Sequence, residues 1–223
     1  MKRLIFVGVS ALLCCIGGMA SGQEQQRAEA AGSAVNVGVQ SQSGVGDEWP
    51  YIPEGEVIVY GIDFSKVQIY GAKESAEQFA NAFVAINALF VSQPDKYDCS
   101  KLSSRQCTVF TYPTDRLVGS INWKYAMGSN GAPHKSSVEE IVANYRLPNT
   151  EGIGLVFIAW LYNKPEATAY YDVVYFDIKT RRILFDTTAT GRASGFSLRN
   201  YWANSIYDIV SRRALRKQIE QVL

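Results

Sequence analysis

The chain has 223 residues, of which 22 are Lys or Arg, 21 are Asp or Glu and one is His. This even balance excludes the strongly basic surface that nucleic-acid binding needs, so we expect no nucleic-acid partner. The single histidine, His134, has no metal-ligand spacing around it, whereas a zinc site needs three or four Cys, His or carboxylate ligands. We therefore expect no metal and no cofactor.

The first 22 residues have the pattern of a secretory signal peptide. A positive start at Lys2–Arg3 is followed by an apolar run from Leu4 to Ile16. That run is too short to cross a bilayer, which takes roughly 20 apolar residues. Small residues at Ala20 and Gly22 predict cleavage before Gln23, which leaves 20 basic and 21 acidic residues and a net charge of −1.

Two cysteines near the end of the apolar run raise the alternative that the exported protein is a lipoprotein. A lipoprotein signal places a lipidated cysteine after the apolar run, and Cys15 fits that pattern better than Cys14. We favour release at Gln23, because both cysteines also suit the apolar run itself. If Cys15 is lipidated, the protein contacts a membrane through this anchor and does not span it.

Residues 23–48 predict a flexible linker, and residues 49–223 predict one domain. The linker is rich in Gln, Ala, Gly, Ser and Glu and holds no aromatic residue. Such a segment cannot bury enough apolar surface to offset its ordering entropy. The remaining stretch of about 175 residues is long enough for one hydrophobic core.

The first expected element is a strand region over residues 56–71, EVIVYGIDFSKVQIYG. Its β-branched and aromatic residues favour strand. Alternate residues from Ile58 to Phe64 are assigned to one face, and the alternation changes phase after Ser65. A change of phase predicts two strands or one bent strand.

Two helices are predicted from their capping boxes. Ser75 and Gln78 begin an amphipathic helix whose apolar stripe runs from Phe79 to Phe90. Ser137 precedes a shorter helix, expected over residues 138–145. We expect the first stripe to belong to the core, as any helix that covers a sheet requires.

The middle of the chain predicts strands over residues 107–112 and 115–127. Cys99 and Cys107 flank a polar loop of seven residues, and they are the cysteines that remain after signal removal. In an oxidising compartment such a pair usually bonds, so we expect a disulfide between them. Two free buried thiols are the alternative.

The C-terminal third predicts an antiparallel meander followed by a helix. Residues 152–162 are apolar on both faces, which predicts a central strand covered on both sides or one face that meets a partner. Residues 169–178 and 182–190 follow after short turns, and the second alternates as a strand with one solvated face. The basic run over residues 212–217 is expected to be the solvated face of a helix.

The stretch TGRASGFSLRNYWA, residues 190–203, joins the last strand to a helix that begins near Ser197. Its glycine spacing is G-x-x-x-G, which matches neither a dinucleotide-binding nor a P-loop motif. We therefore interpret it as a structural turn. Arg192 and Arg199 stay candidates for contact with an anion or a partner.

The aromatic content, 13 Tyr and 4 Trp, suits either sugar binding or a sheet. We favour the sheet, and expect Trp160 and Trp202 to be packed. A carboxylate pair for glycoside hydrolysis would form only in the fold, so a hydrolase stays an alternative.

The segment from Tyr170 to Val210 resembles a group of small, uncharacterised envelope proteins of Gram-negative bacteria. The matching positions are Asp177, Thr180, Gly191, Ala193, Gly195, Phe196, Asn200, Tyr201 and Trp202. The resemblance covers most of residues 57–92 and 152–210, and the loop between Cys99 and Cys107 departs from it. More distantly, the order of elements is similar to the N-terminal domains of TolB-type periplasmic lipoproteins and to curli-pore-type lipoproteins. The resemblance implies no catalytic residue, because the group has no established activity.

These observations predict a single α+β domain with an antiparallel or mixed β-sheet and amphipathic helices packed on it. The expected function is that of an exported, non-catalytic envelope protein in the periplasm, at the outer membrane or outside the cell. It would bind another envelope protein or support assembly of a surface structure. A small-ligand or glycan-binding domain is the first alternative, and a carboxylate-dependent hydrolase is the second.

Overall fold

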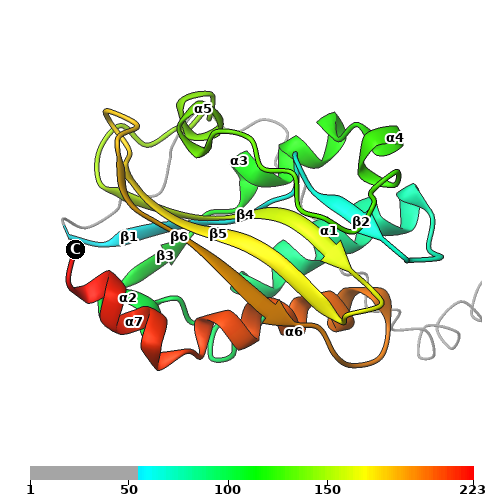
Figure 1. Ribbon diagram of the computed structural model, residues 1–223. Helices are drawn as coiled ribbons and strands as arrows, with labels where there is room; N and C mark the ends of the chain where they lie inside the picture. The colour runs from blue at the N-terminus through cyan, green and yellow to red at the C-terminus, as the bar shows by residue number, and fades with distance from the viewer. Residues whose placement is uncertain (1–54) are drawn as a thin grey trace, which may run out of the picture. The chain divides into compact units, whose positions relative to one another are not determined.

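A computed structural model of the protein describes residues 55–223, drawn as a coloured ribbon in Figure 1. The predicted signal peptide (residues 1–22), the predicted linker (residues 23–48) and Cys15 lie outside the described residues. In chain order the elements are β1 (Val57–Asp63), β2 (Gln68–Tyr70), α1 (Ala76–Ser92), α2 (Ser100–Ser103), β3 (Cys107–Val109), α3 (Tyr112–Asp115), the 3-10 helix η1 (Arg116–Ser120), α4 (Trp123–Ala126), α5 (Val138–Ala143), β4 (Ile153–Asn163), β5 (Thr168–Asp177), β6 (Ile183–Arg192), α6 (Leu198–Val210) and α7 (Arg213–Glu220).

The six strands form one mixed sheet in the order β3-β1-β4-β5-β6, with β2 paired to β4 beyond the end of β1. Strand β1 runs parallel to β3 and to β4, whereas β4, β5 and β6 form an antiparallel meander. In the meander, Phe157 of β4 lies opposite Val173 of β5, and Val173 lies opposite Thr187 of β6. The predicted mixed sheet and the predicted meander are both confirmed.

Helices cover both faces of the sheet (Figure 1). The larger core cluster joins one face to α1, α6 and α7, and it contains Trp202. The smaller cluster joins the other face to α5, and it contains Trp160. Strand β4 is buried on both faces, as its two-sided apolar pattern predicted. The described residues lie in one compact unit, which confirms a single domain of mixed helices and strands.

The change of phase in the first strand region lies earlier than the sequence predicted. Ile58 and Tyr60 pack in the smaller cluster, whereas Ile62 and Phe64 pack in the larger one. The assignment of alternate residues from Ile58 to Phe64 to one face was therefore wrong. The pairing of β1 with β4 is irregular between Val59 and Ile62, and Gly61 there has a φ of +75°. An extra residue at such a bulge sends the following side chains to the opposite face.

The bulge in β1 is held by a buried polar residue of α1. The Asn87 side chain accepts the Ile62 amide N–H at 2.8 Å and donates to the Ile62 carbonyl at 3.0 Å. It also donates to Asp115 Oδ1 at 2.8 Å. A Cβ at Gly61 would lie 2.8 Å from Asn87 Oδ1, so this position requires glycine. The asparagine inside the apolar stripe of α1 thus supplies the bonds that the irregular backbone lacks.

The predicted helix starts are largely confirmed. Ser75 and Gln78 form a complete capping box at α1, and the apolar stripe from Phe79 to Phe90 is buried. At α5 the Ser137 hydroxyl accepts the Glu140 amide N–H, but the helix ends at Ala143, before the expected residue 145.

The strands predicted over residues 107–112 and 115–127 are mostly wrong. Only Cys107–Val109 is strand, and most of the rest forms three short helices, α3, η1 and α4. Pro113 lies in the first turn of α3, where an amide N–H would have no partner within the helix and where the fixed φ of proline favours helix. The Asn122 side chain then caps α4 by accepting the Tyr125 amide N–H.

Candidate functional site

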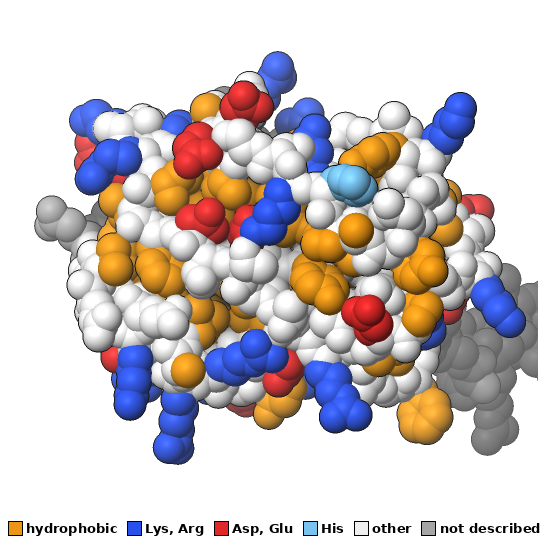
Figure 2. All heavy atoms as spheres, viewed as in Figure 1, with side chains coloured by type: hydrophobic (Ala, Val, Ile, Leu, Met, Phe, Trp, Pro, Cys, Tyr) orange, Lys and Arg blue, Asp and Glu red, His pale blue; other side chains and the backbone are white. Residues whose placement is uncertain are grey.

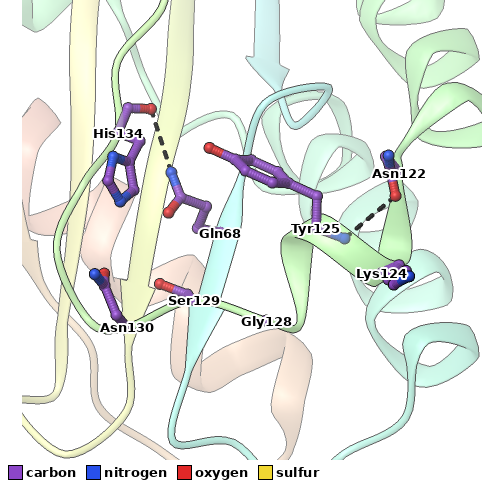
Figure 3. A pocket seen from close by; sticks show the side chains of 8 residues that line it. All are labelled: Gln68, Asn122, Lys124, Tyr125, Gly128, Ser129, Asn130 and His134. Carbon is purple, nitrogen blue, oxygen red and sulfur yellow. Dashed lines mark hydrogen bonds between the residues drawn. The ribbon is translucent and has the colours of Figure 1, made fainter.

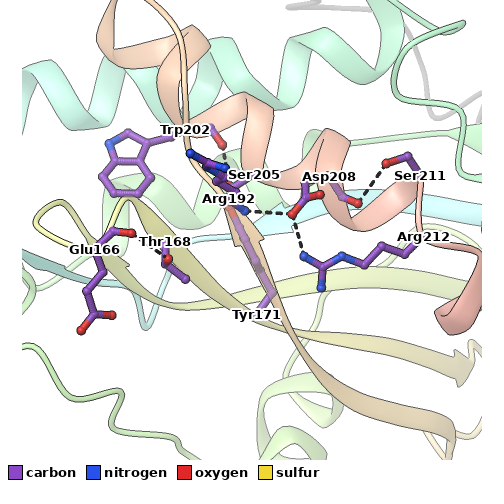
Figure 4. A network of polar contacts seen from close by, with 9 residues as sticks. All are labelled: Glu166, Thr168, Tyr171, Arg192, Trp202, Ser205, Asp208, Ser211 and Arg212. Carbon is purple, nitrogen blue, oxygen red and sulfur yellow. Dashed lines mark hydrogen bonds and ion pairs between the residues drawn. The ribbon is translucent and has the colours of Figure 1, made fainter.

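The connection between β6 and α6 is the loop that the glycine motif forms. The Arg192 amide N–H donates to Asp208 Oδ2 at 3.0 Å, as Figure 4 shows, and Arg212 donates to the same oxygen at 2.6 Å. The Ala193 amide N–H donates to the Ala167 carbonyl at 2.7 Å, which ties the loop to the β4–β5 turn. The first half of the loop is therefore fixed to two neighbouring elements.

The second half of the loop is fixed to α6. The Ser194 amide N–H donates to the Tyr201 carbonyl at 3.0 Å, and Asn204 Nδ2 donates to the Ser194 carbonyl at 2.8 Å. Gly191 allows a close approach of the two backbones, since a Cβ there would lie 2.0 Å from the Ser205 carbonyl oxygen. The interpretation of the motif as a structural turn therefore has a specific physical basis at Gly191.

Below this loop a buried hydrogen-bond network holds α6 to the sheet (Figure 4). The Tyr171 hydroxyl donates to the Tyr162 hydroxyl at 2.9 Å and lies 2.8 Å from Ser205 Oγ. Ser205 Oγ donates to the Trp202 carbonyl at 2.6 Å. Trp202 also stacks on Tyr162, with ring centroids 4.3 Å apart. The loop thus leads into a rigidly packed helix.

Phe196 lies in this loop with 95% of its surface exposed. It is flanked by two residues with positive φ, Gly195 at +109° and Ser197 at +66°. Ser197 also has a ψ of 149° and makes no side-chain cap bond, although it occupies the predicted N-cap position. For a residue other than glycine this backbone conformation is strained, and such strain concentrates at binding and catalytic sites. Phe196 is the residue of this loop that sequence reasoning missed; its signal was an apolar residue between Gly195 and Ser197.

The structure does not place the two candidate arginines in one cavity. Arg192 lines a hollow of about 300 Å³ together with Asp208, and that carboxylate disfavours an anion there. Arg199 lies exposed in the first turn of α6, where its Nε donates to Asn200 Oδ1 at 3.0 Å. Both arginines stay candidates for contact with a partner, and neither belongs to an anion pocket.

Cys99 and Cys107 are free thiols in the structure, so the predicted disulfide is not observed there. Burial raises the pKa of Cys99 well above its usual value, and the charges of Cys107 and Asp98 raise it further. Burial, with the charges of Asp98 and Glu56, raises the pKa of Cys107 to about 12. Both thiols are therefore protonated and unreactive in this form.

The disulfide stays a prediction for the exported protein. We expect intact-mass analysis of protein purified from the envelope to show no alkylation of Cys99 or Cys107 before reduction and two alkylations after reduction. Two alkylated thiols in unfolded, unreduced protein would show that the cysteines remain free. A Cys99→Ser variant is the control, because it leaves one cysteine that must be alkylated without reduction.

Two carboxyl groups, Asp63 and Glu140, line one hollow of about 300 Å³. Asp63 accepts the Ser65 amide N–H and the Tyr145 hydroxyl, each at 2.7 Å. Burial raises the pKa of Tyr145 well above its usual value, and the Asp63 charge adds to this, so the phenol stays protonated. Both Asp63 oxygens thus accept hydrogen bonds from the protein itself. This arrangement supports a structural role in which Asp63 ties the end of β1 to the segment after α5.

A second group of charges lies on the face of the sheet that carries the smaller core cluster. Lys135 Nζ donates to Asp172 Oδ1 and to Thr188 Oγ1, both at 2.5 Å, and the Thr188 hydroxyl donates to the same carboxylate at 2.8 Å. Desolvation raises the pKa of the neighbouring Asp186 to about 6; the charges of Asp172 and Glu139 also raise it, and Lys135 lowers it.

The raised pKa of Asp186 predicts a pH dependence of stability. The folded state holds this proton more tightly than the unfolded state, so the contribution of Asp186 to stability increases as the pH falls from about 7.5 to about 5. We expect Asp186→Asn to raise the melting temperature at the higher pH and to reduce its change with pH. Asp177→Asn is the control, because the bonds from Thr180 lower the pKa of Asp177 and it does not titrate in this window. An unchanged pH profile for Asp186→Asn would contradict the prediction.

Among residues 55–223, no group of three or more His, Cys, Asp or Glu side chains could hold a metal ion. In the same part of the chain, no helix has both the length and the apolar character that crossing a bilayer requires.

The fold and the loop define a single mixed α/β domain in which the exposed side chain of Phe196 projects from a loop whose backbone is hydrogen-bonded to neighbouring elements. No protein-family model and no curated protein matches the chain. Among solved structures, it is similar to the lipoprotein GNA1162 from Neisseria meningitidis, with 13% identity, 72% of this chain and 99% of that chain covered, and a TM-score of 0.28. It is also similar to the hypothetical protein CT253 from Chlamydia trachomatis, with 11% identity, 76% and 98% covered, and a TM-score of 0.29. These likenesses are weak and carry no argument about function.

Proposed function

We propose that this protein is an exported, non-catalytic binding protein of the cell envelope that recognises another protein through the loop around Phe196. The observation that carries the proposal is the 95% exposure of Phe196 in a loop whose backbone is bonded on both sides. Export rests on the signal-peptide pattern of residues 1–22, and N-terminal sequencing of the mature protein tests it.

An exposed aromatic residue on a fixed loop suits protein recognition for two reasons. A phenylalanine side chain that a partner covers buries a large apolar area, and aromatic anchors dominate many interfaces. The fixed loop also means that little conformational entropy is lost on binding. Arg192 and Arg199, both exposed and near the loop in sequence, are candidates for the polar rim of such a contact.

The non-catalytic part of the proposal rests on how Asp63 and Asp172, the two buried acids among the described residues, are used. Asp63, the buried carboxylate of the hollow shared with Glu140, already accepts two bonds from the protein. Asp172 is paired with Lys135. Both acids therefore have structural partners, which favours a binding protein over the hydrolase alternative.

Site-specific crosslinking tests the proposed contact. A photo-reactive phenylalanine analogue at position 196 is expected to crosslink one envelope protein in living cells. The matched control is the same analogue at position 112, because Tyr112 is an exposed aromatic residue on a different element, α3. Equal crosslinking at both positions, or none at position 196, would contradict the proposal.

Phe196→Ala separates binding from folding. Because the side chain is almost fully exposed, we expect the stability of this variant to stay within about 0.5 kcal/mol of wild type. We expect capture of the crosslinked partner by the purified domain to be lost. Retained capture by a folded Phe196→Ala protein would show that the loop is not the contact.

A further inference from the structure

A polar hollow of about 410 Å³ lies beside β2 and α4, on residues that the proposed contact does not use. Figure 3 shows its lining side chains, with Tyr125 reaching from α4 toward Gln68 and His134. Gln68 is only 1% exposed, and its Nε2 donates to the His134 carbonyl at 3.2 Å. A nearly buried carboxamide is thereby fixed in the wall of the hollow.

The carboxamides around this hollow each leave one polar atom without a partner among the described residues. Asn122 Oδ1 accepts the Tyr125 amide N–H, and Asn130 Oδ1 accepts the Ala132 amide N–H, so both Nδ2 groups are left as donors. Gln68 donates through Nε2, so its Oε1 is left as an acceptor. The hollow therefore offers both donors and acceptors from side chains whose orientation is already fixed.

The aromatic and charged residues around the hollow indicate which class of ligand it would bind. Tyr125 is 53% exposed, and its hydroxyl makes no hydrogen bond to the described residues. Within the described part of the chain, no Asp or Glu lines the hollow, and Lys124 is the one Lys or Arg that does. A hydroxyl group both donates and accepts, so several neighbouring hydroxyls would match this mixed set. The apolar C–H face of a sugar ring would at the same time pack on the ring of Tyr125.

We propose that this hollow is a binding site for a neutral saccharide, with the carboxamides of Gln68, Asn122 and Asn130 bonding its hydroxyls and Tyr125 packing on a sugar ring. The volume is in the range of small-ligand sites. The site is separate from the loop around Phe196, so either proposal can fail without the other.

Saturation-transfer-difference NMR with cellobiose and with N,N′-diacetylchitobiose tests the proposal on the mature protein. We expect a transfer signal from at least one of these disaccharides. Tyr125→Leu is expected to remove the signal, and Asn130→Ala is expected to weaken binding about five- to tenfold through the lost donor. Tyr125 and Asn130 are exposed, so both variants are expected to fold, and their melting temperatures check this.

Tyr112→Leu is the matched control, because Tyr112 has the same 53% exposure and does not line the hollow. This variant is expected to bind the disaccharide as wild type does. The proposal is overturned if neither disaccharide gives a signal, or if Tyr125→Leu and Tyr112→Leu bind equally. Crosslinking from position 196 is expected to persist in Tyr125→Leu, which distinguishes a failure of this site from a failure of the protein contact.

Discussion

Replacing Trp202 or Trp160 by alanine is expected to lower the free energy of unfolding by about 3–5 kcal/mol. Both indoles are fully buried, on opposite faces of the sheet, and each removal leaves a large cavity in its core. Thermal or denaturant unfolding followed by circular dichroism measures the loss.

The indole nitrogens predict how phenylalanine at these positions compares with alanine. Neither Trp160 Nε1 nor Trp202 Nε1 has a hydrogen-bond partner among residues 55–223, so a substitution at either position removes no hydrogen bond of the indole. Phenylalanine at either position should therefore cost less than alanine, since it keeps most of the apolar volume. Trp160→Ala with an unchanged melting temperature and a lost partner or glycan would show instead that β4 carries a binding surface.

Replacing Gly191 by alanine is expected to lower stability by about 1–3 kcal/mol or more. The added Cβ would lie 2.0 Å from the backbone oxygen of Ser205, so α6 must move away from β6. This displacement would also disturb the contact of Ser205 with Tyr171. Unfolding measurements on Gly191→Ala test this, and a stability equal to wild type would contradict the close approach.

Two neighbouring substitutions serve as comparisons for Gly191→Ala. Gly195→Val is also expected to destabilise, by about 1–3 kcal/mol, because a β-branched residue resists the φ of +109° at this position. Arg192→Ala is expected to stay within about 0.5 kcal/mol, because the bond to Asp208 comes from the Arg192 backbone and the side chain is exposed. A phosphate or nucleotide that binds wild type but not Arg192→Ala would overturn the structural interpretation of the motif.

If both proposals hold, the domain has two recognition surfaces on one rigid sheet. The loop around Phe196 follows β6, whereas the polar hollow is built on β2 and α4. Figure 2 shows one face of the domain, on which apolar, acidic and basic side chains are interspersed. This mixture of charges on the face shown agrees with the near-neutral charge of the whole chain.

Features with a local cause could be predicted from the amino-acid sequence. The spacing of apolar residues predicted α1 and the antiparallel strands β4, β5 and β6, because helix and strand periodicities are set by neighbours along the chain. The capping box of α1 is likewise a bond between Ser75 and Gln78, three residues apart. The two-sided apolar pattern of β4 was enough to predict that Trp160 is packed.

Features that depend on contacts between distant residues could not be predicted in this way. The phase of β1 changes at Gly61 because Asn87, which bonds the neighbouring Ile62 backbone from far along the chain, completes the bulge there. Within the middle segment only Cys107–Val109 pairs with β1, and residues 112–120 and 123–126 form short helices instead of strands. The Thr114 hydroxyl of α3 donates to the Tyr60 carbonyl of β1, a bond between residues that are far apart in the chain. The exposure of Phe196 and the burial of Gln68 could not be predicted from the sequence either. Whether water or protein covers a side chain is set by the packing of elements that the sequence does not place next to one another.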